Sequence, residues 1–503
     1  MPIKKQINVT INGRRMLVGA GIVLSEITNS EKPCGGHGKC GKCKVIARGE
    51  LSKLTAAELN VLSADELSIG VRLACLTYAL GDCEIETLDR TEKSQRVTDG
   101  DLPDFELNPA FEKYGVAIDI GTTTLAARLY DVKGRMIAYA SQLNPQQEWG
   151  ADVVSRIEAS LGGKADLLAK AIREALDSII FDLARIADID AKEIDGAVIT
   201  GNTVMLSLLT CEDVRPFSHA PFSVNRLFGE SLTANTLELS SLNEDTSIYL
   251  PRCISAFVGA DTTCAVIATQ LCEMETAMLA DIGTNGEMAL WHDGRLTVCS
   301  TAAGPAFEGV NIEMGMRGST GAIDKVTVLN GSVNAHVIGV GEPVGICGSG
   351  LVDAVACMLD LEILDKSGYL EDEKFIIQPP VLLTQQDVRM LQLAKSAICA
   401  GLLTLIESQG LTAKDIPTLY IAGGFGNYLN VHSASRIGLL PIELAKNSKA
   451  VGNSALAGAS MMLLDTDIRG VADKFAVKAE LLELSADQTF SEYYMSGMML
   501  DKI

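Results

Sequence analysis

The sequence lacks the features that would place it in a membrane or on a nucleic acid. It has no apolar run of about 18 residues, and its first residues, Met1-Pro-Ile-Lys-Lys-Gln, contain no apolar signal core. Basic residues are scarce, with 42 Lys and Arg against 64 Asp and Glu, and the formal net charge of -22 opposes binding to a phosphate backbone. We therefore expect a cytoplasmic protein with no membrane or nucleic-acid partner.

Two motifs of common enzyme classes are also missing. There is no Gly-x4-Gly-Lys-Ser/Thr, so the chain has no P-loop nucleotide site. The five histidines show no spacing typical of a catalytic triad or of metal ligands. With 503 residues, of which 47% are hydrophobic, the chain is long enough for about two to four domains. Its function must be sought in other patterns.

Cysteine, by contrast, is plentiful, with 13 in the chain. Three stand in Cys34-Gly-Gly-His-Gly-Lys-Cys40-Gly-Lys-Cys43, and a fourth, Cys75, follows further along. This C-x5-C-x2-C spacing with one distant cysteine differs by one residue from the plant-type ferredoxin pattern, and the glycines let backbone amides approach the sulfurs. The spacing favours a [2Fe–2S] cluster held by Cys34, Cys40, Cys43 and Cys75. A structural zinc site, which usually brings its ligands as two close pairs, is the alternative.

The residues around this loop predict short strands and helices. The alternating Ile7-Asn-Val-Thr-Ile, followed by Asn12-Gly13, is typical of a β-hairpin. The pattern further predicts a helix over 24–28, a strand from Lys44, a helical or irregular stretch over 56–67 and a strand from Cys83. A small mixed sheet crossed by a helix is a β-grasp arrangement, so we expect an α+β ferredoxin-like domain over residues 1–88. The charged stretch 89–112 shows no apolar period and indicates a linker.

One sequence pattern occurs twice in the rest of the chain. Val116-Ala-Ile-Asp-Ile-Gly-Thr-Thr-Thr and Ala280-Asp-Ile-Gly-Thr-Asn-Gly-Glu each read as a strand, a tight turn and a returning strand. Each copy is followed by a Gly-Arg turn, at Gly134-Arg135 and Gly294-Arg295. A single copy is typical of an ordinary hairpin turn, but a repeat 162 residues later predicts two similar α/β lobes that face each other.

These turns carry groups suited to phosphate and Mg²⁺. Glycine lets backbone amides approach a phosphate, and threonine and asparagine add further donors. Asp119 and Asp281 would repel phosphate and are predicted to hold Mg²⁺ or its waters, with Glu287 as a third catalytic candidate. The predicted cofactor-binding residues here are Gly121, Thr122, Thr123, Thr124, Gly283, Thr284, Asn285 and Gly286.

Three other glycine-rich junctions follow strands. Gly423-Gly424-Phe425-Gly426 would place a flat ligand such as adenine against bare backbone, although it is not the dinucleotide fingerprint. In Gly345-Ile-Cys-Gly-Ser349-Gly, Ser349 is a candidate either to cap a helix or to bind phosphate. Thr200-Gly201-Asn202-Thr203 is interpreted as a hinge between the lobes.

Taken together, these motifs resemble a known superfamily. The repeated Asp-Ile-Gly-Thr, the join at Gly201-Asn202-Thr203 and the late Ala-Gly-Gly-Phe-Gly turn are similar to the pattern of the acetate/sugar kinase, heat-shock cognate and actin (ASKHA) superfamily. With the cysteine loop, Arg72-Leu-Ala-Cys75 and Gly304-Pro-Ala-Phe-Glu308-Gly, the whole chain resembles the ATP-dependent reductive activators of corrinoid proteins. The resemblance implies an ASKHA ATPase domain over 113–503, with lobes at about 113–275 and 276–503.

The resemblance also implies an activity. Such an activator uses ATP with Mg²⁺ and one electron from its [2Fe–2S] cluster to reduce inactive Co(II) corrinoid to Co(I). Its partners would be a corrinoid protein of a methyltransferase system and an upstream low-potential electron donor, and dimerisation is left open. Ser300 and Thr301 would then lie on the surface that meets the corrinoid. The competing hypotheses are a small-molecule kinase with a regulatory cluster and a nucleotide-binding redox sensor that is not an enzyme.

Overall fold

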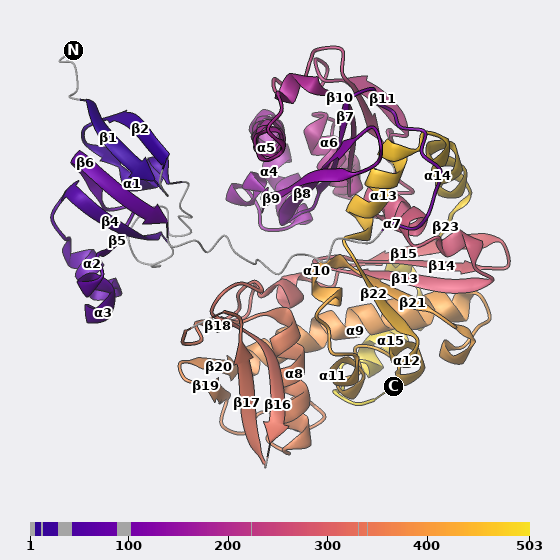
Figure 1. The fold of residues 1–503 in the computed structure, drawn as a ribbon. Coiled ribbons are helices and arrows are strands. Elements are labelled where there is room, and N and C mark those ends of the chain that lie inside the picture. Colours follow the sequence, from indigo (N-terminus) through magenta and orange to yellow (C-terminus); the bar gives the residue numbers. More distant parts are fainter. Residues whose placement is uncertain are drawn as a thin grey trace. The chain divides into compact units, whose positions relative to one another are not determined.

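The computed structural model divides the chain into two compact units, Met1–Ser94 and Gln95–Ile503 (Figure 1). Each unit has its own hydrophobic core. The structure describes residues 6–11, 14–28, 43–87, 102–222, 224–329, 331–339 and 341–502. Two of the four predicted cluster ligands, Cys34 and Cys40, lie outside these ranges.

The first unit is built on one mixed sheet. Its strands are β1 (Gln6–Ile11), β2 (Arg14–Gly19), β3 (Ile22–Val23), β4 (Lys44–Leu51), β5 (Val71–Leu73) and β6 (Tyr78–Thr87). They are ordered β2-β1-β6-β4-β5, with β3 pairing to β6. Strands β1 and β2 form the predicted antiparallel hairpin, and β1 pairs in parallel with β6. Ile7 and Val9 face the core while Gln6 and Asn8 face solvent, as the alternating pattern predicted.

Short helices lie between these strands. They are α1 (Leu24–Ile27), α2 (Ala56–Val61) and α3 (Ala64–Ser68). A capping box of Thr55 and Glu58 begins α2, because each side chain bonds the other residue's backbone amide. The helices predicted over 24–28 and 56–67 are confirmed, and the strand predicted from Cys83 begins earlier, at Tyr78.

Two matching sheets form the core of the second unit. The first contains β7 (Tyr114–Ile120), β8 (Thr124–Asp131), β9 (Met136–Leu143), β10 (Ile194–Gly201), β11 (Glu230–Thr233) and β12 (Ser247–Leu250), in the order β11-β12-β10-β7-β8-β9. The second contains β13 (Thr276–Ile282), β14 (Gly286–His292), β15 (Arg295–Thr301), β21 (Leu419–Ala422), β22 (Ser448–Gly452) and β23 (Glu480–Leu481), in the order β22-β21-β13-β14-β15-β23.

The two sheets confirm the repeat predicted from the sequence. In each, three consecutive strands pair antiparallel, and the first of the three also pairs in parallel with a later strand, β10 or β21. The Gly-Arg turns are also equivalent, since Gly134 and Gly294 both have φ of +75°. Only glycine adopts this backbone conformation without strain, so the same turn chemistry serves both hairpins.

Helices and smaller sheets surround these cores. The helices of the second unit are α4 (Val153–Ala159), α5 (Ala165–Ala187), α6 (Thr203–Leu209), α7 (Ala260–Ala268), α8 (Gly348–Asp360), α9 (Gln385–Ser408), α10 (Gly423–Gly426), α11 (Val431–Arg436), α12 (Ile442–Lys446), α13 (Ser454–Leu464), α14 (Asp467–Lys478) and α15 (Gln488–Ser496). The smaller sheets are β16 (Ala322–Leu329) with β17 (Ser332–Val337) and β18 (Gly345–Ile346), and β19 (Lys374–Gln378) with β20 (Val381–Thr384).

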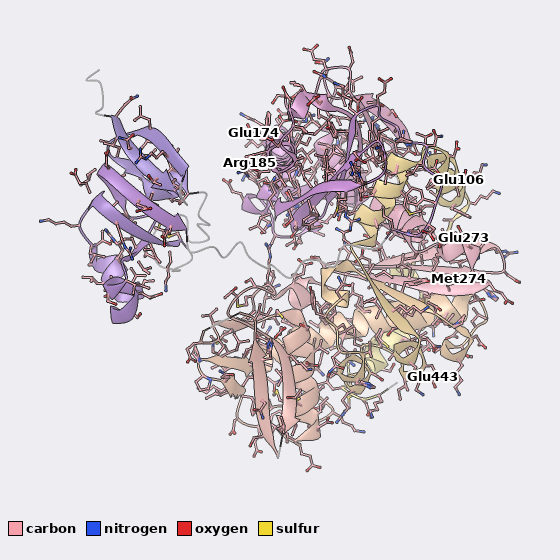
Figure 2. All side chains as sticks on the ribbon, in the orientation of Figure 1. Glu106, Glu174, Arg185, Glu273, Met274 and Glu443 are labelled. Carbon is pink, nitrogen blue, oxygen red and sulfur yellow. The ribbon has the colours of Figure 1, made fainter. Side chains whose placement is uncertain are left out.

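The long helices illustrate why these segments are helical. In α5, apolar residues recur every three or four positions and face the core, whereas Glu174 and Arg185 project outward (Figure 2). Helix α9 is long and apolar enough to cross a membrane by composition alone. However, 78% of its apolar window is buried inside the second unit, which is typical of a core helix in a globular protein.

Two helices connect the lobes. Helix α7 joins β12 of the first sheet to β13 of the second, while α13 follows β22 of the second sheet and packs on β7 and β10 of the first. They cross where Gly458 meets Cys264, and a Cβ on Gly458 would lie 2.0 Å from the Cys264 carbonyl oxygen. The close crossing of the two backbones therefore depends on glycine at this position.

Part of the predicted linker packs on the second unit. Phe111 is 6% exposed, and the backbone amides of Asn108 and Ala110 donate to the carbonyls of Leu464 and Leu463. Residues 102–112 of the predicted linker thus pack against the second unit.

The helix crossing gives a test of packing. We expect Gly458→Ala to lower the free energy of unfolding by ~2 kcal/mol, because its methyl group meets a fixed backbone oxygen. In the matched control Gly470→Ala, on exposed α14, no atom lies within 4 Å of the added Cβ, so ~0.5–1 kcal/mol of stabilisation is expected. Urea unfolding of both variants measures the change in the free energy of unfolding. Equal changes in the two variants would contradict the close packing of α13 on α7 at Gly458.

Candidate functional site

The repeated turns lie at equivalent ends of β7 and β13. The amide of Gly121 donates to the Thr124 carbonyl at 3.0 Å, and that of Gly283 donates to the Asn285 carbonyl at 3.1 Å. A Cβ at Gly121 would lie 2.7 Å from the Thr124 oxygen, so this turn requires glycine. A Cβ at Gly283 would have no heavy atom nearer than 3.7 Å, which leaves room beside that turn.

One carboxylate joins the two turns. Glu308 ends a 3-10 helix, η6 (Pro305–Glu308). Its Oε2 accepts a hydrogen bond from the Thr123 hydroxyl and its Oε1 accepts one from the Thr284 hydroxyl, each at 2.5 Å. The structure therefore brings these two predicted residues, one from each lobe, within the span of a single side chain. Glu308 belonged to a motif visible in the sequence but was not predicted as a site residue.

Acidic side chains gather beside the turns: Glu287 is buried, and Asp119 and Asp281 are half-buried. Burial raises the pKa of Asp119 to about 7, an effect that a hydrogen bond from Asn453 reduces and the charge of Asp281 increases. Burial and then the charge of Glu308 raise the pKa of Asp281 to about 6. Burial likewise raises the pKa of Glu287 to about 7, with the charge of Asp281 adding to it. Such shifts show that the ionised groups repel one another in poorly solvated surroundings.

A further acid in this cluster was not predicted from the sequence. Asp261 stands at the beginning of α7, and its pKa is raised by burial and by the charges of Glu287 and Asp119. The neighbouring Thr262 hydroxyl donates to the Glu287 carboxylate. In the sequence, Asp261 stands two residues after Gly259 at an ordinary loop-to-helix junction, so only its position in the fold reveals it.

This acidic cluster is suited to a cation that arrives with other ligands. Among the residues that the structure describes, no three His, Cys, Asp or Glu side chains converge on one metal position. Mg²⁺ is commonly held by one or two carboxylates together with phosphate oxygens and water. The arrangement can therefore bind a divalent cation that a phosphate ligand helps to coordinate.

Three side chains that were not predicted as ligands position these groups. Asn202 begins α6 and donates from Nδ2 to the Thr122 hydroxyl at 3.2 Å, so the predicted hinge also contacts a turn. Asn453 begins α13 and donates to Asp119 Oδ2 at 2.9 Å. Arg156 is fully buried and donates to the Thr122 carbonyl at 2.5 Å. Asn202 and Asn453 could have been noticed in the sequence, because asparagine is common at the start of a helix. No sequence pattern pointed to Arg156.

The late glycine-rich turn lies against the same acids. Gly423 has φ of +87°, and a Cβ there would lie 2.6 Å from Asp281 Oδ1. A Cβ on Gly424 would meet no heavy atom within 4 Å, so the backbone of this residue borders open space. Phe425 stacks on Phe307 with ring centroids 4.7 Å apart. Gly426 instead packs closely on Ile421.

Other predicted residues lie elsewhere. Ser349 is 5% exposed and donates to the Asp324 carbonyl at 2.9 Å, while Cys347 is the residue that begins α8, so the predicted cap is absent and the hydroxyl is used internally. A Cβ at Gly286 would lie 2.3 Å from Ile398 of α9, which explains this glycine by packing. Thr124 is exposed at the start of β8.

The predicted partner contacts lie on β15. Ser300 pairs with Glu287 and Thr301 pairs with Gly286 of β14. Ser300 also lines a cavity of about 170 Å³, together with Phe222, Phe257 and Leu481 among others.

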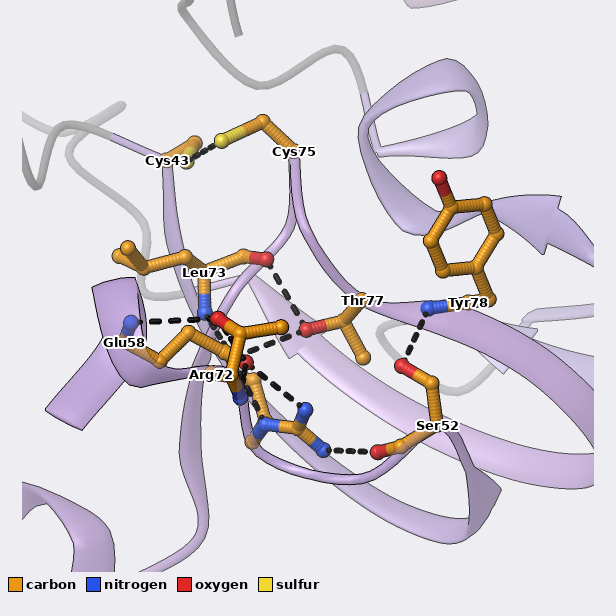
Figure 3. A network of polar contacts seen from close by, with 9 residues as sticks. Cys43, Ser52, Glu58, Arg72, Leu73, Cys75, Thr77 and Tyr78 are labelled. Atoms are coloured by element: carbon orange, nitrogen blue, oxygen red, sulfur yellow. Dashed lines mark hydrogen bonds and ion pairs between the residues drawn. The ribbon is translucent and has the colours of Figure 1, made fainter. Parts of the chain in front are cut away.

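In the first unit, the two described cluster cysteines are neighbours. Cys43 precedes β4 and Cys75 follows β5, and their Sγ atoms lie 3.2 Å apart without a disulfide bond between them (Figure 3). Cys43 is buried, at 2% exposed, whereas Cys75 is half-buried. The fold thus unites a cysteine of the Cys34–Cys43 loop with the distant fourth cysteine.

A buried ion pair supports the segment that carries Cys75. The fully buried Glu58 accepts hydrogen bonds from Arg72 Nε at 2.9 Å, the Leu73 amide at 3.2 Å and the Thr77 hydroxyl at 3.1 Å (Figure 3). Burial acts to raise the pKa of Glu58, but the hydrogen bonds from Arg72 and two backbone amides outweigh it and lower that pKa. Glu58 therefore stays ionised and fixes both sides of Cys75 in the chain.

Comparison with known proteins identifies the family. Residues 275–503 match the family described as the C-terminal domain of RACo, the ASKHA domain, and residues 114–274 match the RACo middle region. The corrinoid activation enzyme RamQ of Eubacterium limosum is 34% identical over 450 residues, which cover 83% of this chain and 76% of RamQ. The chain belongs to the RACo family.

Other RACo relatives agree with this membership. A Methanosarcina barkeri protein named as the reductase of the Co(II) methylated amine-specific corrinoid protein is 27% identical, with 76% of each chain covered. The solved structure of a reductive activator for corrinoid, iron-sulfur protein has a TM-score of 0.73 at 28% identity, covering 99% of this chain and 98% of that one. The resemblance to corrinoid activators and the ASKHA fold of the C-terminal domain are thereby confirmed. The family description applies the ASKHA name to 275–503 and treats 114–274 as a region of its own.

The acidic cluster predicts an unusual stabilising substitution. Because the pKa of Asp281 is raised from 3.8 to about 6, its ionisation opposes folding above about pH 6 and not below about pH 4. We expect Asp281→Asn to stabilise the nucleotide-free protein by ~1–2 kcal/mol near pH 8 and by less near pH 5. This value is reduced because the Asp281 side chain is partly exposed to solvent. Urea unfolding in EDTA measures this, with the exposed Asp293→Asn as the control of equal charge change. Destabilisation at both pH values would contradict the charge argument.

The Glu58 network predicts the opposite pH dependence. We expect Glu58→Gln to destabilise the first unit by ~3 kcal/mol at neutral pH, because Arg72 is left with a buried, unpaired charge. Since the pKa of Glu58 is lowered, its contribution is present above about pH 4.5 and is lost as the pH falls further, so the two proteins should converge in acid. Hydrogen exchange of the β4 and β6 peptides in the full chain measures this. The partly exposed pair Lys44–Glu66 gives the control Glu66→Gln, expected to cost under ~1 kcal/mol.

Proposed function

We propose that this chain is an ATP-dependent reductive activator of corrinoid proteins, which delivers one electron from a [2Fe–2S] cluster to convert inactive Co(II) corrinoid to Co(I). The observation that carries this proposal is the pairing of two phosphate-type turns, joined through Glu308, in a RACo-family chain that also holds a cysteine-bearing unit. A redox centre and a two-lobed nucleotide site on one chain point to electron delivery that nucleotide controls.

The nucleotide would bind between the lobes. The turns at 121–124 and 283–286 would hold the phosphates, and Asp119, Asp281 and Glu287 would face Mg²⁺. The open backbone at Gly424 and the Phe425 ring would border the adenine, with Gly423 and Gly426 shaping that turn. Support comes from the raised pKa values of the three acids, because a bound divalent cation restores the ionised carboxylates. Ser349 is left as a residue that supports α8.

The cluster would be held by Cys34, Cys40, Cys43 and Cys75 in a β-grasp ferredoxin-like domain. The mixed sheet with β1 parallel to β6 and the adjacent thiols of Cys43 and Cys75 support this assignment. Thiolates are the ligands that both iron–sulfur clusters and zinc prefer, so zinc is the alternative occupant. A bound [2Fe–2S] cluster would supply one-electron storage.

Nucleotide would control when the electron moves. A plant-type cluster has a potential near about -400 mV, and every shortfall of about 59 mV in a one-electron step costs tenfold in equilibrium. ATP binding can compensate only if the ATP and ADP states differ in their affinity for the corrinoid protein. Closure of the two lobes around ATP would supply that difference. An upstream low-potential donor would reload the cluster.

The corrinoid protein would meet the second lobe at β15. Ser300 borders a cavity that also presents Phe222 and Phe257, two aromatic rings in edge-to-face contact. Aromatic side chains with nearby hydroxyls are common in protein interfaces. We therefore keep Ser300 as the proposed contact residue for a corrinoid protein of a methyltransferase system. The predicted Thr301 is only 8% exposed, so the expected surface position does not hold for it.

The decisive experiment measures cobalt oxidation state. Under anaerobic conditions, the protein with a stoichiometric reductant, ATP and a Co(II) corrinoid protein should yield the Co(I) absorption spectrum, and omission of ATP should prevent it. Cys75→Ala should lose bound iron and Co(I) formation, whereas Cys83→Ala, a buried cysteine of β6, should retain both.

Four outcomes would contradict the proposal. Failure to form Co(I) with every component present would reject the activator. Phosphate transfer to a metabolite without any corrinoid requirement would favour the kinase, and negligible ATP turnover with all partners would favour the sensor. One zinc per chain, without iron or labile sulfide, would reject the cluster.

A further inference from the structure

Glu308 links the two lobes through both oxygens of its carboxylate. These oxygens accept hydrogen bonds from hydroxyls of different lobes, Thr123 after β7 and Thr284 after β13, both at 2.5 Å. Charge-assisted hydrogen bonds of this length are strong compared with neutral ones. One side chain therefore holds the two repeated turns together.

The chemistry of this contact is that of a bound anion. Paired hydroxyl donors at the ends of glycine turns are the groups that also bind phosphate oxygens. A carboxylate and a phosphate cannot both accept from the same hydroxyl hydrogens, and their like charges repel at contact distance. Gly283 adds to the match, because its missing side chain leaves the space next to Glu308 Oε1 open, with 3.8 Å to a hypothetical Cβ.

Glu308 is presented by a fixed turn. The amide of Gly304, just before η6, donates to the Thr284 carbonyl at 2.9 Å. Phe307 stacks on Phe425 of the glycine-rich turn, and its carbonyl oxygen would lie 2.0 Å from a Cβ on Gly348 at the start of α8. The backbone of η6 is therefore anchored within the second lobe, so the bond from Thr123 is the part of this contact that spans the lobes.

We propose that in the nucleotide-free protein the Glu308 carboxylate occupies the position of the terminal phosphate of ATP, and that the triphosphate displaces it from Thr123 and Thr284. The inference rests on the proposed nucleotide site and goes beyond it. ATP replaces both hydrogen bonds, whereas ADP leaves them to Glu308. After hydrolysis and phosphate release, Glu308 again joins the turns, so the two nucleotide states differ at the lobe junction.

Binding of nucleotide, without turnover, tests this. Calorimetry on the full chain with Mg²⁺ compares AMP-PNP, a triphosphate that is not hydrolysed, with ADP. In Glu308→Gln, the amide nitrogen cannot accept a hydrogen bond, so the side chain competes less well with a phosphate for the two threonine hydroxyls. AMP-PNP should therefore bind about 10-fold more tightly. ADP affinity should stay within about twofold, because ADP does not displace Glu308.

Two further variants distinguish competition between Glu308 and phosphate from a general loss of structure. Glu308→Asp keeps the charge but is one methylene shorter, so it should fail to span both hydroxyls and should also tighten AMP-PNP binding. Glu313→Gln removes an equal charge from an exposed position five residues further on and should leave both affinities unchanged. Loss of a merely structural residue would weaken binding, not strengthen it.

The outcomes distinguish this inference from the proposed function. If the wild-type protein binds neither nucleotide, the nucleotide site itself is rejected, and this inference with it. If the wild type binds both but Glu308→Gln binds AMP-PNP equally or more weakly, the competitor role alone is overturned. Equal tightening for ADP and AMP-PNP would overturn the assignment to the terminal phosphate.

Discussion

Removal of acidic side chains from solvent is the constraint on which the second unit depends. Asp119, Asp281 and Glu287 come from β7, β13 and β14, and burial is the main cause of the raised pKa of each, with neighbouring negative charges adding to it. Packing that collects like charges opposes folding, so the surrounding cores must supply the difference. The chain retains this cluster although neutral residues would fold more easily. The cation that we propose for this site would offset the cost, because its charge favours the ionised carboxylates.

The fold connects that cluster to the helices that link the two sheets. Helix α13 leaves the second sheet and packs on the first, and Asn453 at its first turn donates to Asp119. Asn202, at the start of α6, donates to the Thr122 hydroxyl in the same way. A shift of either helix must therefore change the surroundings of a turn or of a carboxylate. At Gly458 the backbone of α13 lies in close contact with that of α7. Because of this contact, a shift of one helix requires a shift of the other.

The sequence predicted what is encoded locally and missed what depends on distant contacts. The repeat was visible because strand, glycine turn and returning strand are set by neighbouring residues, and both sheets confirm it. Asn453 could not be found in this way, because its partner Asp119 lies 334 positions earlier in the chain. Arg156 was missed for the same reason, since its fully buried guanidinium is explained by the Thr122 carbonyl. Of the two roles predicted for Ser349, the helix cap is absent, because its hydroxyl donates to the Asp324 carbonyl of β16 instead.

The first unit shows the same division between local and distant control. Three of its candidate ligands are close in sequence, but Cys75 must be brought to them by the fold. A buried Glu–Arg pair contributes little net stability compared with apolar residues of similar size. Its presence at Glu58 and Arg72 is therefore better explained by position than by stability, because its hydrogen bonds hold Arg72, Leu73 and Thr77 on both sides of Cys75. These bonds support Cys75 beside Cys43, and in the cluster that we propose here they would keep two of the ligands in place when an electron is gained or lost.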